Sequence, residues 1–121
     1  MHRVKRAVHA RKKRKNLLSQ ASGSWGGRKN LVGQARMTVE KALSYSYRDR
    51  RNRKRDFRRL WVVRINAAAR NHGLSYSQFI HGLNQAGVTL DRKVLSDIAV
   101  HDDAAFAQLV KVASQSLQES A

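Results

Sequence analysis

The stretch RDRRNRKRDFRRLWVVRINAAAR, residues 48–70, decides the fold of this chain because its pattern changes near Phe57. At about 100° per residue, the basic side chains of residues 48–59 project around almost the whole circumference of a helix. From Phe57 onward, apolar residues recur at spacings of three and four, as in a helix that packs on a core. The stretch therefore predicts a helix that changes from a solvated basic segment into part of a folded domain.

The net positive charge of the chain comes entirely from its first half. Residues 1–60 contain twenty Lys and Arg against three Asp and Glu, whereas residues 61–121 contain five of each, so the first half carries the whole formal net charge of +17. Such a self-repelling segment needs a polyanion to keep it compact, and nucleic acids are the densest cellular polyanions. We therefore predict a basic extension at residues 1–57 and a self-folding domain at residues 58–121.

Glycines are the residues expected to interrupt the helices, because the chain has seven glycines and no proline. SGSWGG at residues 22–27 predicts a turn after a first basic helical segment. A second helix is expected from about residue 30, since no strong breaker follows before Gly73. Its length would be roughly 60 Å at about 1.5 Å per residue, longer than a core of this size could support.

The domain at residues 58–121 is predicted to be a helical bundle. VTL at residues 88–90 is too short and isolated to build a sheet. The fold class is therefore all-α, with a long basic N-terminal helical extension followed by a small C-terminal helical bundle. The apolar residues at helical spacing are Phe57, Leu60, Trp61, Ile65 and Ala68, then Tyr76, Phe79, Ile80 and Leu83, then Val94, Leu95 and Ile98, and finally Phe106, Leu109, Val110, Ala113 and Leu117. The expected helix caps are Gly73, Ser75 with Gln78, Gly87, Asp91 and Asp102.

Several classes of function are excluded by what the sequence lacks. Without cysteine there is no disulfide framework or thiolate site, and no histidine pair has zinc-ligand spacing. The apolar runs are too short to span a bilayer, so we expect a soluble intracellular protein. His101, Asp102 and Asp103 are adjacent, but a helix N-cap followed by an acidic residue explains them without catalysis. We expect no enzyme, no cofactor and no metal site.

The choice of basic residue favours structured RNA. Residues 48–59 hold seven arginines and one lysine, and a guanidinium group can bind two phosphate oxygens and stack on a base. Trp25, Tyr45 and Tyr47 interrupt the basic run, as expected where unpaired bases stack on aromatic rings. The alternative is that these rings pack on the protein's own helices.

A second candidate surface lies where the first two helices of the bundle meet. Arg64, Asn66 and Arg70 share a helix, and polar residues gather at its end, near the N–H groups of the next helix, which can bind a phosphate. The alternative is ordinary helix capping and solvation. The polar residues at the helix end are His72, Ser75 and Ser77.

The run YRDRRNRKRDFRRLWVVRINAAARNHGLSYSQFIHGL, residues 47–83, resembles the bacterial-type large-subunit ribosomal protein twenty family. RVKR at residues 3–6 and DRKVLSDIAVHDDAAFAQLV, which ends at Val110, share the resemblance. It implies a structural protein of the large ribosomal subunit, with a basic helical extension among segments of large-subunit rRNA and a helical domain that also contacts rRNA. It further implies a role in early subunit assembly and, in some members, repression of the protein's own messenger.

Together these observations predict the partners of the chain. They are large-subunit rRNA, neighbouring large-subunit ribosomal proteins and the chain's own mRNA. We expect no membrane, no small-molecule substrate and no homo-oligomer. The expected location is the ribosome of the cytoplasm or of an organelle. The candidate RNA-binding residues are Arg3, Lys5, Arg6, Arg11, Lys12, Lys13, Arg14, Lys15, Trp25, Arg28, Lys29, Arg36, Tyr47, Arg48, Arg50, Arg51, Arg53, Lys54, Arg55, Arg58, Arg59, Arg64, Arg70, His72, Ser75 and Ser77.

Two other classes of protein share part of this pattern. A DNA-compacting chromosomal protein would have the same charge, but such proteins usually dimerise or insert apolar wedges beside proline, and this chain has no proline. A membrane-surface helix needs a broad apolar face, which the circumferential arginines of residues 48–59 deny it. The DNA-compacting protein is the main alternative.

Overall fold

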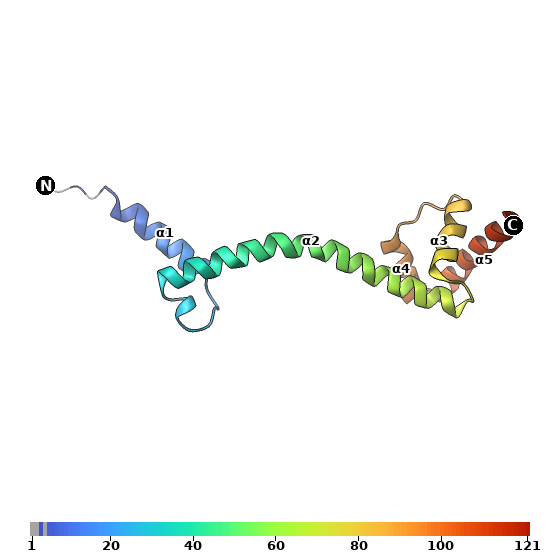
Figure 1. Ribbon diagram of the computed structural model, residues 1–121, viewed down its shortest axis with the longest axis horizontal. Helices are drawn as coiled ribbons and strands as arrows, with labels where there is room; N and C mark the ends of the chain where they lie inside the picture. The colour runs from blue at the N-terminus through green and yellow to red at the C-terminus, as the bar shows by residue number, and fades with distance from the viewer. Residues whose placement is uncertain (1–2, 4) are drawn as a thin grey trace. The chain divides into compact units, whose positions relative to one another are not determined.

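The computed structural model describes residue 3 and residues 5–121, and these form five α-helices and one short 3₁₀ helix without any strand. The elements are α1 (Ala7–Gln20), η1 (Gly26–Arg28), α2 (Val32–Asn71), α3 (Tyr76–Gln85), α4 (Arg92–His101) and α5 (Asp103–Glu119), shown in Figure 1. The all-α prediction, with a long basic helix ahead of shorter ones, is confirmed. No helix in the described part of the chain is long and apolar enough to cross a membrane.

The chain divides into two compact units, of which the first ends at Asn52 and the second begins at Arg53. This division lies within α2, about one and a half helical turns before the boundary at residue 57 expected from composition. The boundary expected at residue 57 marks where the basic composition ends. The boundary at Asn52 marks where the residues that pack together change.

The first unit has a small apolar core. Ala21, Ala35 and Val39 are buried, and Leu17 and Leu18 of α1 pack against them. No residue within α1 itself is buried. Because burial of apolar surface is the main favourable term in folding, so few buried side chains contribute little to the order of this highly charged unit.

The turn between α1 and α2 is built on glycine. Gly23 and Gly26 have φ values of +87° and +58°, a backbone conformation that residues with a Cβ rarely adopt. Within the turn, the N–H of Leu31 donates to the carbonyl of Gly27 at 2.9 Å. The helix that follows starts at Val32, close to the position of about 30 predicted from the sequence.

The second unit has the larger core, formed mainly between α3 and α5. The rings of Phe79 and Phe106 are fully buried with their centroids 5.0 Å apart. Gly82 lies directly against the backbone of Ala113, so α3 and α5 approach each other closely. Figure 1 shows these helices gathered with α4 at the C-terminal end of the chain. The buried residues of the core are Ile65, Ala69, Phe79, Leu83, Leu95, Phe106, Val110 and Ala113.

The contribution of α2 to this core begins later than its sequence pattern indicated. Phe57 and Leu60 were assigned to the core by their spacing, but they are 48% and 39% exposed. Ile65 and Ala69, in the last two turns of α2, are fully buried. The prediction for Phe57 and Leu60 was wrong, because helical periodicity identifies an apolar face but not how much of that face the neighbouring helices cover.

The predicted helix C-caps at glycine are confirmed. Gly73 and Gly87 have φ values of +86° and +76°, as expected where a left-handed residue ends a helix. After Gly73, the N–H of Leu74 turns back to the carbonyl of Ala69 at 3.0 Å, which satisfies an acceptor at the end of α2.

The predicted N-caps are also confirmed. Ser75 and Gln78 form a capping box, with the Gln78 N–H donating to Ser75 Oγ at 3.3 Å and the Ser75 N–H donating to Gln78 Oε1 at 3.1 Å. The carboxylates of Asp91 and Asp102 each accept from the N–H three residues later, at 2.9 and 3.0 Å. Local sequence therefore determines where these helices begin.

Candidate nucleic-acid interface

The basic section of α2 presents basic side chains to solvent around about two thirds of its circumference. All eight basic residues between positions 48 and 59 are exposed, and their spacing distributes them around the helix. A helix in a globular protein normally has one covered side, so full exposure leaves each of these groups available to a partner. The eight residues are Arg48, Arg50, Arg51, Arg53, Lys54, Arg55, Arg58 and Arg59.

Two acidic residues within this section pair with arginines. Asp56 lies 3.6 Å from Arg59, one turn further along the helix. Asp49 lies 3.0 Å from the Nε of the adjacent Arg48. Both pairs are exposed, so each contributes at most about 1 kcal/mol to stability. Neither pair removes a guanidinium from the surface.

The aromatic residues of the first unit differ in their surroundings. Trp25 is 89% exposed, so its ring is not packed on the protein's own helices. Arg48 lies over the ring of Tyr45 at 4.4 Å from the centroid, and Arg51 lies over Tyr47 at 5.2 Å. The two tyrosines therefore pair with arginines, while Trp25 offers both faces of an indole to a partner.

The remaining candidates in the first unit are also exposed. They come from the N-terminal segment, from α1, from the turn and from the first turns of α2, so no single face of one element carries them. Their contact with RNA stays a prediction. These residues are Arg3, Lys5, Arg6, Arg11, Lys12, Lys13, Arg14, Lys15, Arg28, Lys29 and Arg36.

The second candidate surface is only partly free. Arg64, Arg70 and Ser77 are exposed, and the Nε of Arg70 donates to Asn66 Oδ1 at 3.2 Å. His72 is turned toward α5, with its Nε2 3.3 Å from Asp103 Oδ1 and its ring 6.0 Å from that of Phe106.

Substitutions of Ser75 distinguish helix capping from phosphate binding at this surface. We expect Ser75→Ala to lower the free energy of unfolding by about 1 kcal/mol, because Ser75 Oγ accepts the Gln78 N–H. Urea unfolding measures this loss. A Ser75→Asp variant keeps a capping oxygen but repels phosphate, so weaker RNA binding by Ser75→Asp at unchanged stability assigns a phosphate contact to this helix end.

Sequence reasoning missed the role of Arg92. Its Nε donates to the hydroxyl of Tyr76 at 2.8 Å in a partly buried position. This bond joins the start of α4 to the start of α3. No local sequence signal indicates it, because the two residues are sixteen positions apart and belong to different helices.

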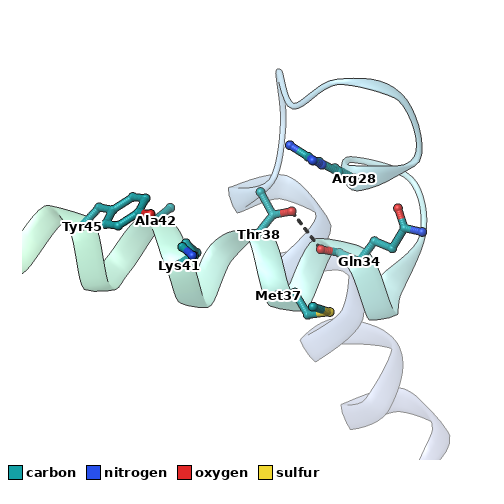
Figure 2. A pocket seen from close by; sticks show the side chains of 7 residues that line it. All are labelled: Arg28, Gln34, Met37, Thr38, Lys41, Ala42 and Tyr45. Atoms are coloured by element: carbon teal, nitrogen blue, oxygen red, sulfur yellow. Dashed lines mark hydrogen bonds between the residues drawn. The ribbon is translucent and has the colours of Figure 1, made fainter.

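A hollow beside the turn was also missed. It has a volume of about 780 Å³ and lies within the first unit, between η1 and the first turns of α2. Figure 2 shows its side chains, most of which come from one stripe of α2, whereas Arg28 comes from η1. The spacing of positions 34, 38, 41 and 45 indicates one stripe of a helix, but no local signal indicates the turn that folds beside it. The lining residues are Arg28, Gln34, Met37, Thr38, Lys41, Ala42 and Tyr45.

Comparison with known proteins identifies the family. The family model described as "Ribosomal protein L20" matches residues 3–109, which covers both units. The chain belongs to the ribosomal protein L20 family. A relative from Roseiflexus castenholzii named "Large ribosomal subunit protein bL20" is 63% identical over 115 residues, covering 95% of this chain and 98% of the relative. One from Thermomicrobium roseum with the same name is 59% identical over 117 residues, covering 97% of this chain and the whole relative.

Membership of the ribosomal protein L20 family confirms the resemblance drawn from residues 47–83. A ribosomal protein of this kind is a structural component and not an enzyme. The comparisons do not assign individual contacts, so the candidate RNA-binding residues remain predictions.

Proposed function

We propose that this protein is a constituent of the large ribosomal subunit that binds large-subunit rRNA directly. The names of its relatives support the ribosomal role. The observation that carries direct RNA binding is the exposure of all eight basic residues between positions 48 and 59 on several sides of α2. RNA phosphates on several sides of the helix can each contact a basic side chain.

The mechanism is electrostatic. Phosphate groups from separate RNA segments repel one another, and a helix with guanidinium groups on several sides lowers that repulsion when it lies between them. Arginine suits this role because its planar group binds two phosphate oxygens and can also stack on a base.

The two parts of the chain have different tasks in this proposal. Residues 1–57 form the extension that enters the RNA, and residues 58–121 form the folded anchor. The contrast in burial between the two units, which divide at Asn52, supports two parts with different tasks, since the first unit has a small core and Phe79 and Phe106 of the second are fully buried. In the anchor, Arg64, Arg70 and Ser77 are the exposed candidates for a second rRNA contact.

Three further roles belong to the proposal. The protein supports early assembly of the subunit, because a chain that neutralises phosphates is most useful before RNA segments are packed. Neighbouring ribosomal proteins and the protein's own mRNA are its other partners, and the resemblance of its sequence to the family supports both. Its location is the ribosome in the cytoplasm.

Competition between two nucleic acids tests the proposal. A structured fragment of large-subunit rRNA and a DNA duplex of equal phosphate number are offered to the intact protein at 0.3 M salt, where non-specific phosphate binding is weak. We expect the rRNA fragment to bind at least about tenfold more tightly, because specific binding exceeds the shared electrostatic contribution. Equal affinities, or preference for the duplex, would instead support a DNA-compacting protein.

A further inference from the structure

The hollow between η1 and α2 has the chemistry of a nucleotide site. Two cations, Arg28 from the turn and Lys41 from the helix, line it, and no carboxylate is among the lining residues. Tyr45 and Met37 add apolar surface and remain 43% and 71% exposed. Arg48 and Lys41 lie over the Tyr45 ring at 4.4 and 5.5 Å from its centroid, and cations beside a ring that stays partly exposed suit a ligand that has both phosphate and a flat base.

Polar groups in the lining complete this chemistry. The Thr38 hydroxyl donates to the backbone carbonyl of Gln34 at 2.9 Å, so its oxygen lone pairs stay available to accept from an amino group (Figure 2). The Gln34 carboxamide, with one acceptor and two donors, lies near Gly27 in the same unit. Such groups can hydrogen-bond the ribose hydroxyl or the phosphate of a nucleotide whose base lies on Tyr45.

The small core of the first unit lies beside the hollow. Ala35 and Val39 of α2 pack with Ala21, on a different face of the helix from Gln34, Thr38 and Tyr45. Arg48 lies over the Tyr45 ring at 4.4 Å and helps to fix it. The Tyr45 ring therefore has a neighbour that limits its motion, which lowers the entropic cost of binding at the ring.

We propose that this hollow binds one unstacked nucleotide of an RNA, with the base against Tyr45 and the phosphates near Arg28 and Lys41. The inference rests on the proposed function, because it names which part of an RNA this site takes. Its volume of about 780 Å³ lies in the range of small-ligand sites. An RNA is favoured over a protein segment because the surrounding unit is strongly basic, with Glu40 as the sole acidic residue before Asp49.

Two RNA hairpins of equal length and charge test this inference with the intact protein. One is fully paired, and the other has a single bulged nucleotide, so only the second offers an unstacked base. Fluorescence anisotropy at 0.3 M salt should show at least about fivefold tighter binding of the bulged hairpin, since stacking of one base on an aromatic ring has that effect or more. Tyr45→Leu should make the two affinities equal.

Phe57→Leu is the matched control, because Phe57 is another exposed aromatic residue of α2 that lies outside the hollow. It should keep the preference for the bulge. The inference is overturned if the wild-type protein shows no preference, or if Tyr45→Leu keeps it. That failure is distinguishable from failure of the proposed function, because the proposed function requires only preference for the rRNA fragment over duplex DNA.

Photo-methionine gives an independent readout in the assembled large subunit. The chain has two methionines, Met1 and Met37, so a diazirine at Met37 is assigned by peptide mapping. Crosslinking of Met37 to a nucleotide supports the inference. Crosslinking to a peptide of another protein overturns it.

Discussion

Replacing Gly82 by alanine is expected to lower the free energy of unfolding of the second unit by about 2 kcal/mol. A Cβ at this position would lie 2.5 Å from the carbonyl oxygen of Ala113 and 2.9 Å from its Cα. These are backbone atoms of α5, so α3 and α5 must separate to admit a methyl group. The higher helix propensity of alanine offsets about 1 kcal/mol, which is less than the loss of packing around Phe79 and Phe106.

Tryptophan fluorescence in urea measures this effect in a Trp25→Phe background, which leaves Trp61 as the reporter of the second unit. Gly33→Ala is the control, because a Cβ at Gly33 meets nothing within 4 Å. It should leave the unfolding midpoint of Trp61 unchanged. A Gly82→Ala variant as stable as the wild-type protein would show that α3 and α5 are not packed as closely as the structure indicates.

Replacing four arginines of α2 by glutamine is expected to change the salt dependence of RNA binding. If the wild-type protein makes about ten phosphate contacts, log affinity should fall with log salt at a slope of roughly −7 to −9. Loss of four contacts should reduce that slope by about 3 to 4 and weaken binding on the order of 10² to 10³-fold at 0.15 M salt. The four are Arg50, Arg53, Arg55 and Arg58, which lie outside the ion pairs that the structure describes for Asp49 and Asp56.

The matched variant replaces the same four arginines by lysine. Lysine keeps the charge, so the slope should stay near the wild-type value, while affinity for structured RNA falls because the bidentate guanidinium contacts are lost. Circular dichroism checks that all variants remain helical. If the glutamine variant kept the wild-type slope, α2 would not be the phosphate-binding element.

Much of the fold could be predicted because its signals are local. Gly73 and Gly87 end helices by adopting a left-handed conformation, and Ser75, Asp91 and Asp102 begin them by capping. Each of these effects acts within one turn of helix. The exposure of Phe57 could not be predicted, because it depends on how far the other helices of the bundle extend along α2.

The candidate site divides in the same way. The exposure of Arg50 and its neighbours follows from their spacing around a helix. The inward turn of His72 toward Asp103 and the bond from Arg92 to Tyr76 depend on contacts between helices. The hollow at Tyr45 needs a turn folded beside α2, and sequence spacing gives only the stripe on the helix.

Electron cryomicroscopy of the assembled large subunit tests the central claim most directly. We predict that the guanidinium groups of residues 48–59 lie within hydrogen-bonding distance of rRNA phosphates on several sides of α2. A map in which this section of the helix stands in solvent, with its arginines away from RNA, would contradict the account.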